Sequence, residues 1–231
     1  MQIRCQSDGS ILVSQEAYTN KILQKFNRAE AKGVSTPVSR EESEYHTNVK
    51  GKVLCREAVG SLMYLAAATR SDIAFAVNKA AQAMHRLTEK VWKNVKRIFR
   101  CLRSTSNYGL RYTRGSGELK VFSDADFAGD KVTRRSTTDV IALFADGAVS
   151  WTSQLQKTTL LTTEAEIIAA SERDKELVWL KRLLSELSDC QKNTGTVHRQ
   201  RQCHQADQEP GVSQKFEKLW VATLLFEGEI P

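Results

Sequence analysis

The sequence lacks several features that would assign a function at once. It has no run of about 18 apolar residues, so no membrane span is predicted. Its first ten residues, MQIRCQSDGS, lack the apolar core of a signal peptide. It contains no CxxC pair, no Gly-rich phosphate loop and no nucleophile elbow. Its five cysteines stand singly, which favours reduced thiols in an intracellular protein, cytoplasmic or nuclear and not secreted.

What the sequence does have is an excess of positive charge, +7 over 231 residues. Residues 191–231 hold five Lys/Arg and five Asp/Glu, so the whole excess lies before them. A basic surface favours polyanions, with nucleic acid first among them. A mildly basic protein with no such partner is the alternative, and charge alone does not separate the two.

The first half of the chain is predicted to be mainly helical after a short hairpin. Residues 2–14 alternate around an Asp8-Gly9 turn, and a helix capped by Ser14 should follow, with Ala17, Ile22, Leu23 and Phe26 on one face. The polar stretch 33–52 contains Pro37 and is typical of a linker. Helical spacing then marks 55–69, 71–84 and 88–105, with Val59, Leu62, Met63 and Ala66 forming the apolar face of the first of these.

The third of these helices concentrates basic side chains opposite an apolar stripe. Its apolar positions are Val91, Trp92, Val95, Ile98, Phe99 and Leu102. Its candidate nucleic-acid-binding residues are Lys90, Lys93, Lys96, Arg97, Arg100 and Arg103. No acid lies between Lys90 and Arg103 to balance them, which favours a phosphate-facing role over a merely solvated face.

After Ser104 the pattern changes to a period of two. Residues 108–124 predict two strands around a Gly115–Gly117 turn, and 136–153 predict two more around Asp146-Gly147. A long helix over 162–188 follows, which Thr163 could cap. Its expected buried stripe is Ile167, Ala170, Leu177, Leu180, Leu184 and Leu187. Strands followed by a covering helix predict an α+β layer.

Carboxylates cluster where one predicted strand ends and where the long helix begins. The stretch LKVFSDADFAGD places Asp124, Asp126 and Asp130 in sequence, and Glu166 lies in the first turns of the helix. Convergent carboxylates repel unless a cation lies between them, and hard oxygen ligands suit Mg²⁺ or Mn²⁺. Two such ions could stabilise the attacking and leaving oxygens of a phosphodiester. The alternative is a solvated turn together with a glutamate favoured by the helix dipole.

Several motifs, in order from about residue 6 to 188, resemble one family of polyproteins. SDADFAGD, RRSTTD, AVSWTSQLQKTTLLTTEAEIIAASE and ELVWLKRLLSEL resemble the ribonuclease H domain of Ty1/copia-type LTR retrotransposon Pol polyproteins. VGSLMYLAAATRSDIAFAVNKAAQAMHRLTEK and the residues after it are similar to the stretch that precedes that domain. DGSILVSQEAYTNKILQKFN with GVSTP resembles the end of the reverse transcriptase. Two departures are TTDVIALF, where the family is richer in Gly, Tyr and Phe, and Ile167, where Tyr is common.

The resemblance implies a ribonuclease H-like fold, a mixed α/β sheet with packed helices after a mainly helical connection segment. It implies a reverse transcriptase remnant over 1–37, a linker and connection over 38–115, an incomplete ribonuclease H-like domain over 116–190 and an aberrant tail over 191–231.

The family's activity is cleavage of the RNA strand of RNA–DNA hybrids with Mg²⁺ or Mn²⁺. By motif, Asp124 matches the first catalytic aspartate and Glu166 the catalytic glutamate, so both are the expected metal ligands. Asp126 and Asp130 match loop acids. The expected partners are a hybrid or other nucleic acid and the rest of a Pol polyprotein, with no membrane. The polymerase's own aspartate pair is absent, so no polymerisation is expected.

After Cys190 the family pattern stops, and it returns if the codons are read one base late from about Val197. We therefore expect a frameshift between about Cys190 and Val197, which leaves Arg199 where the family has its third aspartate. Losing the third and fourth carboxylates predicts weak or absent nuclease activity. Two alternatives stay open: a non-catalytic nucleic-acid-binding module, and a host-retained structural protein.

Overall fold

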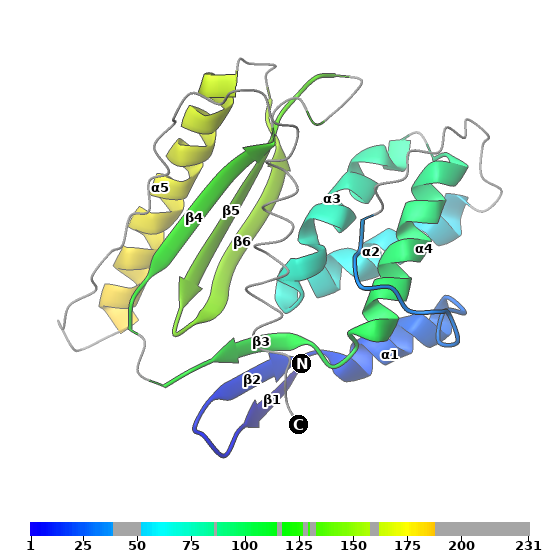
Figure 1. Ribbon diagram of the computed structural model, residues 1–231, viewed down its shortest axis with the longest axis horizontal. Coiled ribbons are helices and arrows are strands. Elements are labelled where there is room, and N and C mark those ends of the chain that lie inside the picture. The colour runs from blue at the N-terminus through cyan, green and yellow to red at the C-terminus, as the bar shows by residue number, and fades with distance from the viewer. Residues whose placement is uncertain are drawn as a thin grey trace. The chain divides into compact units, whose positions relative to one another are not determined.

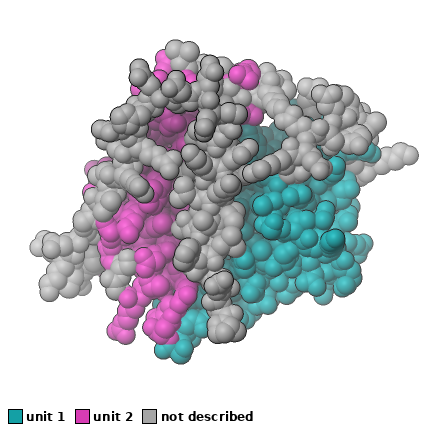
Figure 2. Space-filling view, viewed as in Figure 1, with its two compact units in different colours: residues 1–7, 11–110 teal, residues 8–10, 111–231 magenta. Residues whose placement is uncertain are grey.

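A computed structural model describes residues 1–38, 52–85, 87–114, 117–126, 129, 133–157 and 162–187. Asp130, Gly115, most of the predicted linker and everything predicted for the tail lie outside these residues. The chain divides into two compact units, residues 1–7 with 11–110 and residues 8–10 with 111 onward (Figure 2). No helix in the part that the structure describes is long and apolar enough to cross a membrane.

The first unit opens with the predicted hairpin, β1 (Gln2–Cys5) and β2 (Ile11–Ser14), paired antiparallel. Gly9 at its turn has φ +82°, a left-handed conformation that glycine adopts without steric cost. The Asp8 carboxylate accepts the Ser10 N–H at 2.8 Å, as in an Asx turn. This confirms the Asp8-Gly9 turn and its mechanism.

Helices make up the rest of the first unit. They are α1 (Glu16–Lys25), α2 (Lys52–Ala68), α3 (Ala74–Gln82) and α4 (Glu89–Ser104), with single 3₁₀ turns η1 (Ser71–Ile73) and η2 (Ala83–His85). All four helices contribute to one apolar core, in which the Phe26 and Phe99 rings lie 5.2 Å apart. The predicted apolar stripe of α4 is confirmed, because Val95, Ile98 and Leu102 are fully buried.

Three details of the helix predictions are wrong. The N-cap of α1 is Gln15 and not Ser14, and no side chain accepts a capping hydrogen bond there. Ala17 is exposed, while Thr19 takes the buried position on that face. Met63 is half exposed, because the core side of α2 passes through Leu62 and Leu65.

The strands after Ser104 exist, but they do not pair as predicted. β3 (Gly109–Tyr112) joins β1 and β2 in the order β1-β2-β3, and β4 (Lys120–Asp126) starts a second sheet in the order β4-β5-β6 (Figure 1). Gly109 explains the choice, since a Cβ there would collide with the backbone of Val13. The hairpin predicted around Gly115–Gly117 is therefore wrong.

The second sheet consists of the predicted antiparallel hairpin over residues 136–153, which is confirmed, and of β4 beside it. β5 (Thr137–Phe144) pairs with β4 on one side and with β6 (Gly147–Leu155) on the other. Its turn is centred on Ala145 and Asp146, both with positive φ, and not on Asp146-Gly147. Positive φ at both central residues is the type I′ pattern that matches strand twist. The pairings β1–β2, β4–β5 and β5–β6 are all antiparallel, so the class is α+β, and the mixed sheet stays a prediction.

Helix α5 (Thr162–Leu187) covers one face of this second sheet. Leu177 and Leu180 pack against Val121, Val140 and neighbouring apolar side chains of β4 and β5. Thr163 lies inside the helix and does not cap it. The predicted stripe is wrong at Ile167 and Leu187, which are 63% and 74% exposed, because alanines take the contact positions nearer the helix start.

Candidate metal-binding and nucleic-acid-binding residues

Asp124 lies near the end of β4, with a carboxylate directly across the sheet from it. The register pairs Asp124 with Asp139 of β5, and Asp139 in turn with Ser153 of β6. Directly opposed residues in an antiparallel pair have Cβ atoms roughly 4.5–5.5 Å apart on the same face. Asp139 is 9% exposed. Sequence reasoning missed Asp139, although an acid inside the apolar strand TTDVIALF was a signal.

Glu166 lies at the start of α5, where the helix rests on β4. Its neighbours Ala165 and Ala169 are fully buried against Ala125, and these small side chains allow a close approach of helix and strand. Side chains alternate along a strand, so Asp124 points to the face opposite Ala125. In the described sheet β4 is an edge strand, and a side chain from the start of α5 that reaches past this edge would approach the Asp124 carboxylate.

The electrostatics of Glu166 show that the two predicted ligands interact. Burial raises the pKa of the Glu166 carboxyl, and the negative charge of Asp124 raises it further. Both causes disfavour the ionised form of Glu166. A divalent cation between the two carboxylates would relieve both, and oxygen donors are the type that Mg²⁺ and Mn²⁺ prefer. The residues present therefore suit a hard cation, held by two protein ligands.

The remaining acids do not extend this pair into a larger cluster. Asp126 is the last residue of β4 and not a loop acid, and its carboxylate lies against Gly129, where an added Cβ would collide with it. Within the described ranges, no group of three or more His, Cys, Asp or Glu side chains is placed to hold a metal ion. Among the described residues, Asp124 and Glu166 interact electrostatically and no further acid joins them in a group that could hold a metal, so their role as ligands stays a prediction.

The basic side of α4 is occupied in part by another segment of the chain. Residues 28–36, which we call the strap, follow α1 and lie against α4. Arg103 Nε donates to the Ala29 carbonyl at 2.6 Å, and Arg100 Nε donates to the Lys32 carbonyl at 2.7 Å. Arg97 Nε donates to the Thr36 carbonyl at 3.1 Å, and its terminal nitrogen donates to Thr36 Oγ1 at 2.8 Å. Of the other predicted basic residues, Lys93 is exposed and Lys90 and Lys96 are half-buried.

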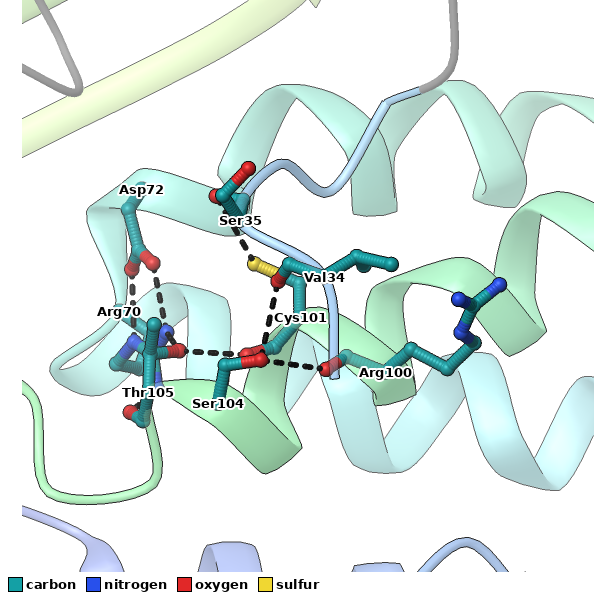
Figure 3. A network of polar contacts seen from close by, with 8 residues as sticks. All are labelled: Val34, Ser35, Arg70, Asp72, Arg100, Cys101, Ser104 and Thr105. Carbon is teal, nitrogen blue, oxygen red and sulfur yellow. Dashed lines mark hydrogen bonds and ion pairs between the residues drawn. The ribbon is translucent and has the colours of Figure 1, made fainter. Parts of the chain in front are cut away.

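Near the C-terminal end of α4, the buried Arg70 connects α4 to the turn after α2 through hydrogen bonds (Figure 3). Arg70 forms a bidentate ion pair with Asp72, at 2.8 and 2.7 Å. It also donates to the Thr105 carbonyl at 2.8 Å and to Thr105 Oγ1 at 2.6 Å. Burial lowers the pKa of the guanidinium, but the charge and the hydrogen bond of Asp72, together with Cys101 and Tyr108, more than offset this, so the pKa lies above its ordinary value. The network fixes the end of α4 on which the strap rests.

Comparison with known proteins gives relatives over most of the chain. It is 42% identical over 200 residues to the retrovirus-related Pol polyprotein from transposon TNT 1-94 of Nicotiana tabacum, covering 82% of this chain and 15% of that protein. It is 39% identical over 180 residues to the polyprotein from transposon RE1 of Arabidopsis thaliana, covering 76% of this chain and 12% of that protein. Secreted RxLR effector protein 161 of Plasmopara viticola is 45% identical over 125 residues, covering 53% of this chain and 88% of that protein.

No protein-family model and no solved structure matches the chain. The chain spans less than a sixth of the length of the two polyproteins.

Proposed function

The chain belongs to the retrovirus-related Pol polyproteins of Ty1/copia-type transposons, and on that premise we propose that it carries an impaired ribonuclease H-type site. Asp124 and Glu166 would hold one Mg²⁺ or Mn²⁺ near the scissile phosphate of an RNA–DNA hybrid. The ion would supply charge stabilisation and an activated water when bound. The two carboxylates would orient the ion, and cleavage by this chain would be weak or absent.

The observation that carries this proposal is the position of Asp124 near the end of β4 and of Glu166 at the start of α5, and the raised pKa of Glu166 supports it. A carboxylate whose pKa is raised by burial and by the charge of Asp124 is destabilised in its ionised form. Perturbed titratable groups cluster at functional sites, where a ligand supplies the missing countercharge. Asp124 and Glu166 lie near the end of β4 and at the start of α5, far apart in sequence, which supports the proposal.

The expected impairment of cleavage follows from the predicted loss of two carboxylates in the tail. Two protein ligands hold a divalent ion more weakly than three or four, and a two-metal clamp needs more than two carboxylates. Arg199, at the position predicted for the third aspartate, lies outside the described residues. The frameshift proposal is tested by the nucleotide sequence across codons 185–231. That sequence should restore the family pattern when it is read one base late, and stop codons in the shifted frame would reject the proposal.

The test of the nuclease is cleavage of a labelled RNA–DNA hybrid in Mg²⁺ by two chains, the one described and one with the reading frame restored. We expect cleavage by the restored chain and little or none by the present one. In the restored chain Asp124→Asn and Glu166→Gln should abolish cleavage, while Asp126→Asn should retain it. Ordinary rates from the present chain, lost on Asp124→Asn, would refute the impairment. Undiminished cleavage by restored Asp124→Asn would refute the site.

Non-catalytic nucleic-acid binding is the second candidate, and α4 supports it. No carboxylate among the described residues forms an ion pair with Arg97, Arg100 or Arg103, so within that part of the chain three positive charges lie on one helix without an ion-pair partner. Binding to hybrid or duplex should weaken as salt rises, since phosphate contacts release counterions. Failure to bind at low salt would favour the host-retained structural protein.

A further inference from the structure

The strap and α4 together present cationic groups that the sequence does not place side by side. The three α4 arginines each donate from Nε to a strap carbonyl. Lys32, whose carbonyl accepts from Arg100, has an exposed side chain, and Arg28 begins the strap. The strap therefore adds basic residues beside the basic side of α4. Within the strap, Glu30 is the single acid.

The strap and α4 also contact each other through backbone groups. The Val34 N–H donates to the Arg100 carbonyl at 3.3 Å, and Ser104 Oγ donates to the Val34 carbonyl at 3.2 Å. The Cys101 thiol donates weakly to the Ser35 carbonyl at 3.9 Å (Figure 3). A Cβ at Gly33 would collide with Ser104 Oγ, so alanine there would push this hydroxyl out of its hydrogen bond with the Val34 carbonyl. The strap is thus seated on α4 by contacts that do not involve the arginine side chains.

The arginine hydrogen bonds leave part of each guanidinium available. Arg100 and Arg103 use only Nε among the described residues, and their contacts lie in exposed surroundings. Figure 3 shows the Arg100 side chain extending away from Cys101 and Ser104. A guanidinium has five N–H donors in a planar fork, and its terminal pair suits a phosphate. An Nε that is already held by a carbonyl fixes the plane of that fork before a phosphate arrives.

We propose that the strap and α4 form one composite phosphate-binding surface, in which strap carbonyls hold Arg97, Arg100 and Arg103 in place for a nucleic-acid backbone. This rests on the proposed nucleic-acid contact and names its geometry. Long cationic side chains lose rotamer entropy on binding, so side chains that are ordered beforehand bind more tightly. Lys32 contributes a further phosphate contact from the strap.

The test is equilibrium binding of a short RNA–DNA hybrid, measured by fluorescence anisotropy over a series of salt concentrations. EDTA is present so that no cleavage occurs. Gly33→Ala should break the Ser104–Val34 contact and loosen the strap without changing the charge. Gly60→Ala is its control, because a Cβ there meets nothing within 4 Å. We expect Gly33→Ala to bind roughly two- to tenfold more weakly for each arginine that is released. Gly60→Ala should bind as the unchanged chain does.

Two further variants keep the test decisive if Gly33→Ala unfolds, which circular dichroism would reveal. Thr36→Val removes the hydroxyl that accepts from Arg97 and leaves the backbone carbonyl, so it should weaken binding within a folded chain. Lys32→Ala should reduce the salt slope by about 0.9 on the log–log plot, while Lys21→Ala, on the exposed side of α1, should not.

Each outcome separates this inference from the function on which it rests. An unchanged chain that does not bind at low salt refutes both the nucleic-acid contact and the composite surface. Binding by the unchanged chain with equal affinity for folded Gly33→Ala and Gly60→Ala refutes the composite surface alone. Tighter binding by Gly33→Ala also refutes it, and shows that the strap masks the arginines.

Discussion

Removing the Arg70 guanidinium should destabilise the first unit more than any surface change in the same helices. The side chain is 2% exposed and donates four hydrogen bonds of 2.6–2.8 Å, two to Asp72 and two to Thr105. The Tyr108 ring lies 5.6 Å from it. Truncating one partner of a buried ion pair leaves the other partner's charge uncompensated, which costs about 3–5 kcal/mol.

The expected magnitude is therefore about 3–5 kcal/mol for Arg70→Met. Arg70→Lys keeps the charge but cannot reproduce the fork, so it should lose about 2–3 kcal/mol, since hydrogen bonds to charged groups are worth about 1.5–3 kcal/mol each. A domain of this size has roughly 5–15 kcal/mol in total. Arg70→Met should thus remove a large share of the first unit's stability.

Urea unfolding with a double-mutant cycle is the assay. With a slope of about 1–3 kcal/mol/M, a loss of about 3–5 kcal/mol should lower the Arg70→Met midpoint by about 1–5 M. Asp72→Asn should cost less in the Arg70→Met background than alone, by a coupling of about 0.5–3 kcal/mol. Arg4→Met is the control, because its ion pair with Glu16 is exposed and worth about 0–1 kcal/mol. A loss below about 1 kcal/mol for Arg70→Met, or no coupling, would refute the reasoning.

Two further changes test the second unit and the glycine geometry. Burial and the Asp124 charge raise the Glu166 pKa in the folded state, so stability is lost as pH rises through that pKa. Glu166→Gln should then raise the melting temperature at neutral pH with EDTA present, and should give no gain below the ordinary value of 4.5. A gain that does not depend on pH would contradict this reasoning. A Cβ at Gly147 would collide with the backbone and ring of β3, so Gly147→Ala should cost about 1–3 kcal/mol in urea unfolding. Gly60→Ala, in open space within α2, should instead gain up to about 1 kcal/mol, and equal effects of the two would count against the geometry.

Local periodicity predicted the helices well where large apolar side chains mark the buried face. In α4 the positions of Val95, Ile98 and Leu102 follow the 3.6-residue period, and all three are buried. In α5 the contact near the helix start is made by Ala165 and Ala169, which hydrophobicity hardly marks. Counting large side chains therefore shifted the predicted stripe onto exposed positions.

Pairing between distant strands could not be read from the pattern around each strand. The alternation over residues 108–124 is compatible with a hairpin, and β3 instead pairs with a strand almost a hundred residues earlier. The contact that decides it is a backbone approach at Gly109, which only a glycine permits. The strap is a similar case, since nothing local to residues 28–36 indicates that α4 would hold their carbonyls.

The metal-binding role of Asp124 and Glu166 stays a prediction, and the structure adds only that the two carboxylates interact. Asp124 and Glu166 came from the family resemblance, and the raised pKa of Glu166 reports their interaction. Asp139 was not predicted, because its significance depends on the register that sets it opposite Asp124. The role of a residue in a strand can be judged only when the residue opposite it in the sheet is known.

The two proposed activities depend on different parts of the chain, and this separates binding from cleavage. The composite surface uses the strap and α4, which are seated on the closed core of the first unit. The carboxylate pair uses β4 and α5, and β4 is an edge of the described sheet, in the unit whose family pattern stops after Cys190. Loss of later ligands would weaken the metal site and leave the arginines in place. A chain with intact arginines and an incomplete carboxylate site should therefore bind a hybrid without cutting it. Restoring the reading frame should change the cleavage rate far more than the affinity for the hybrid.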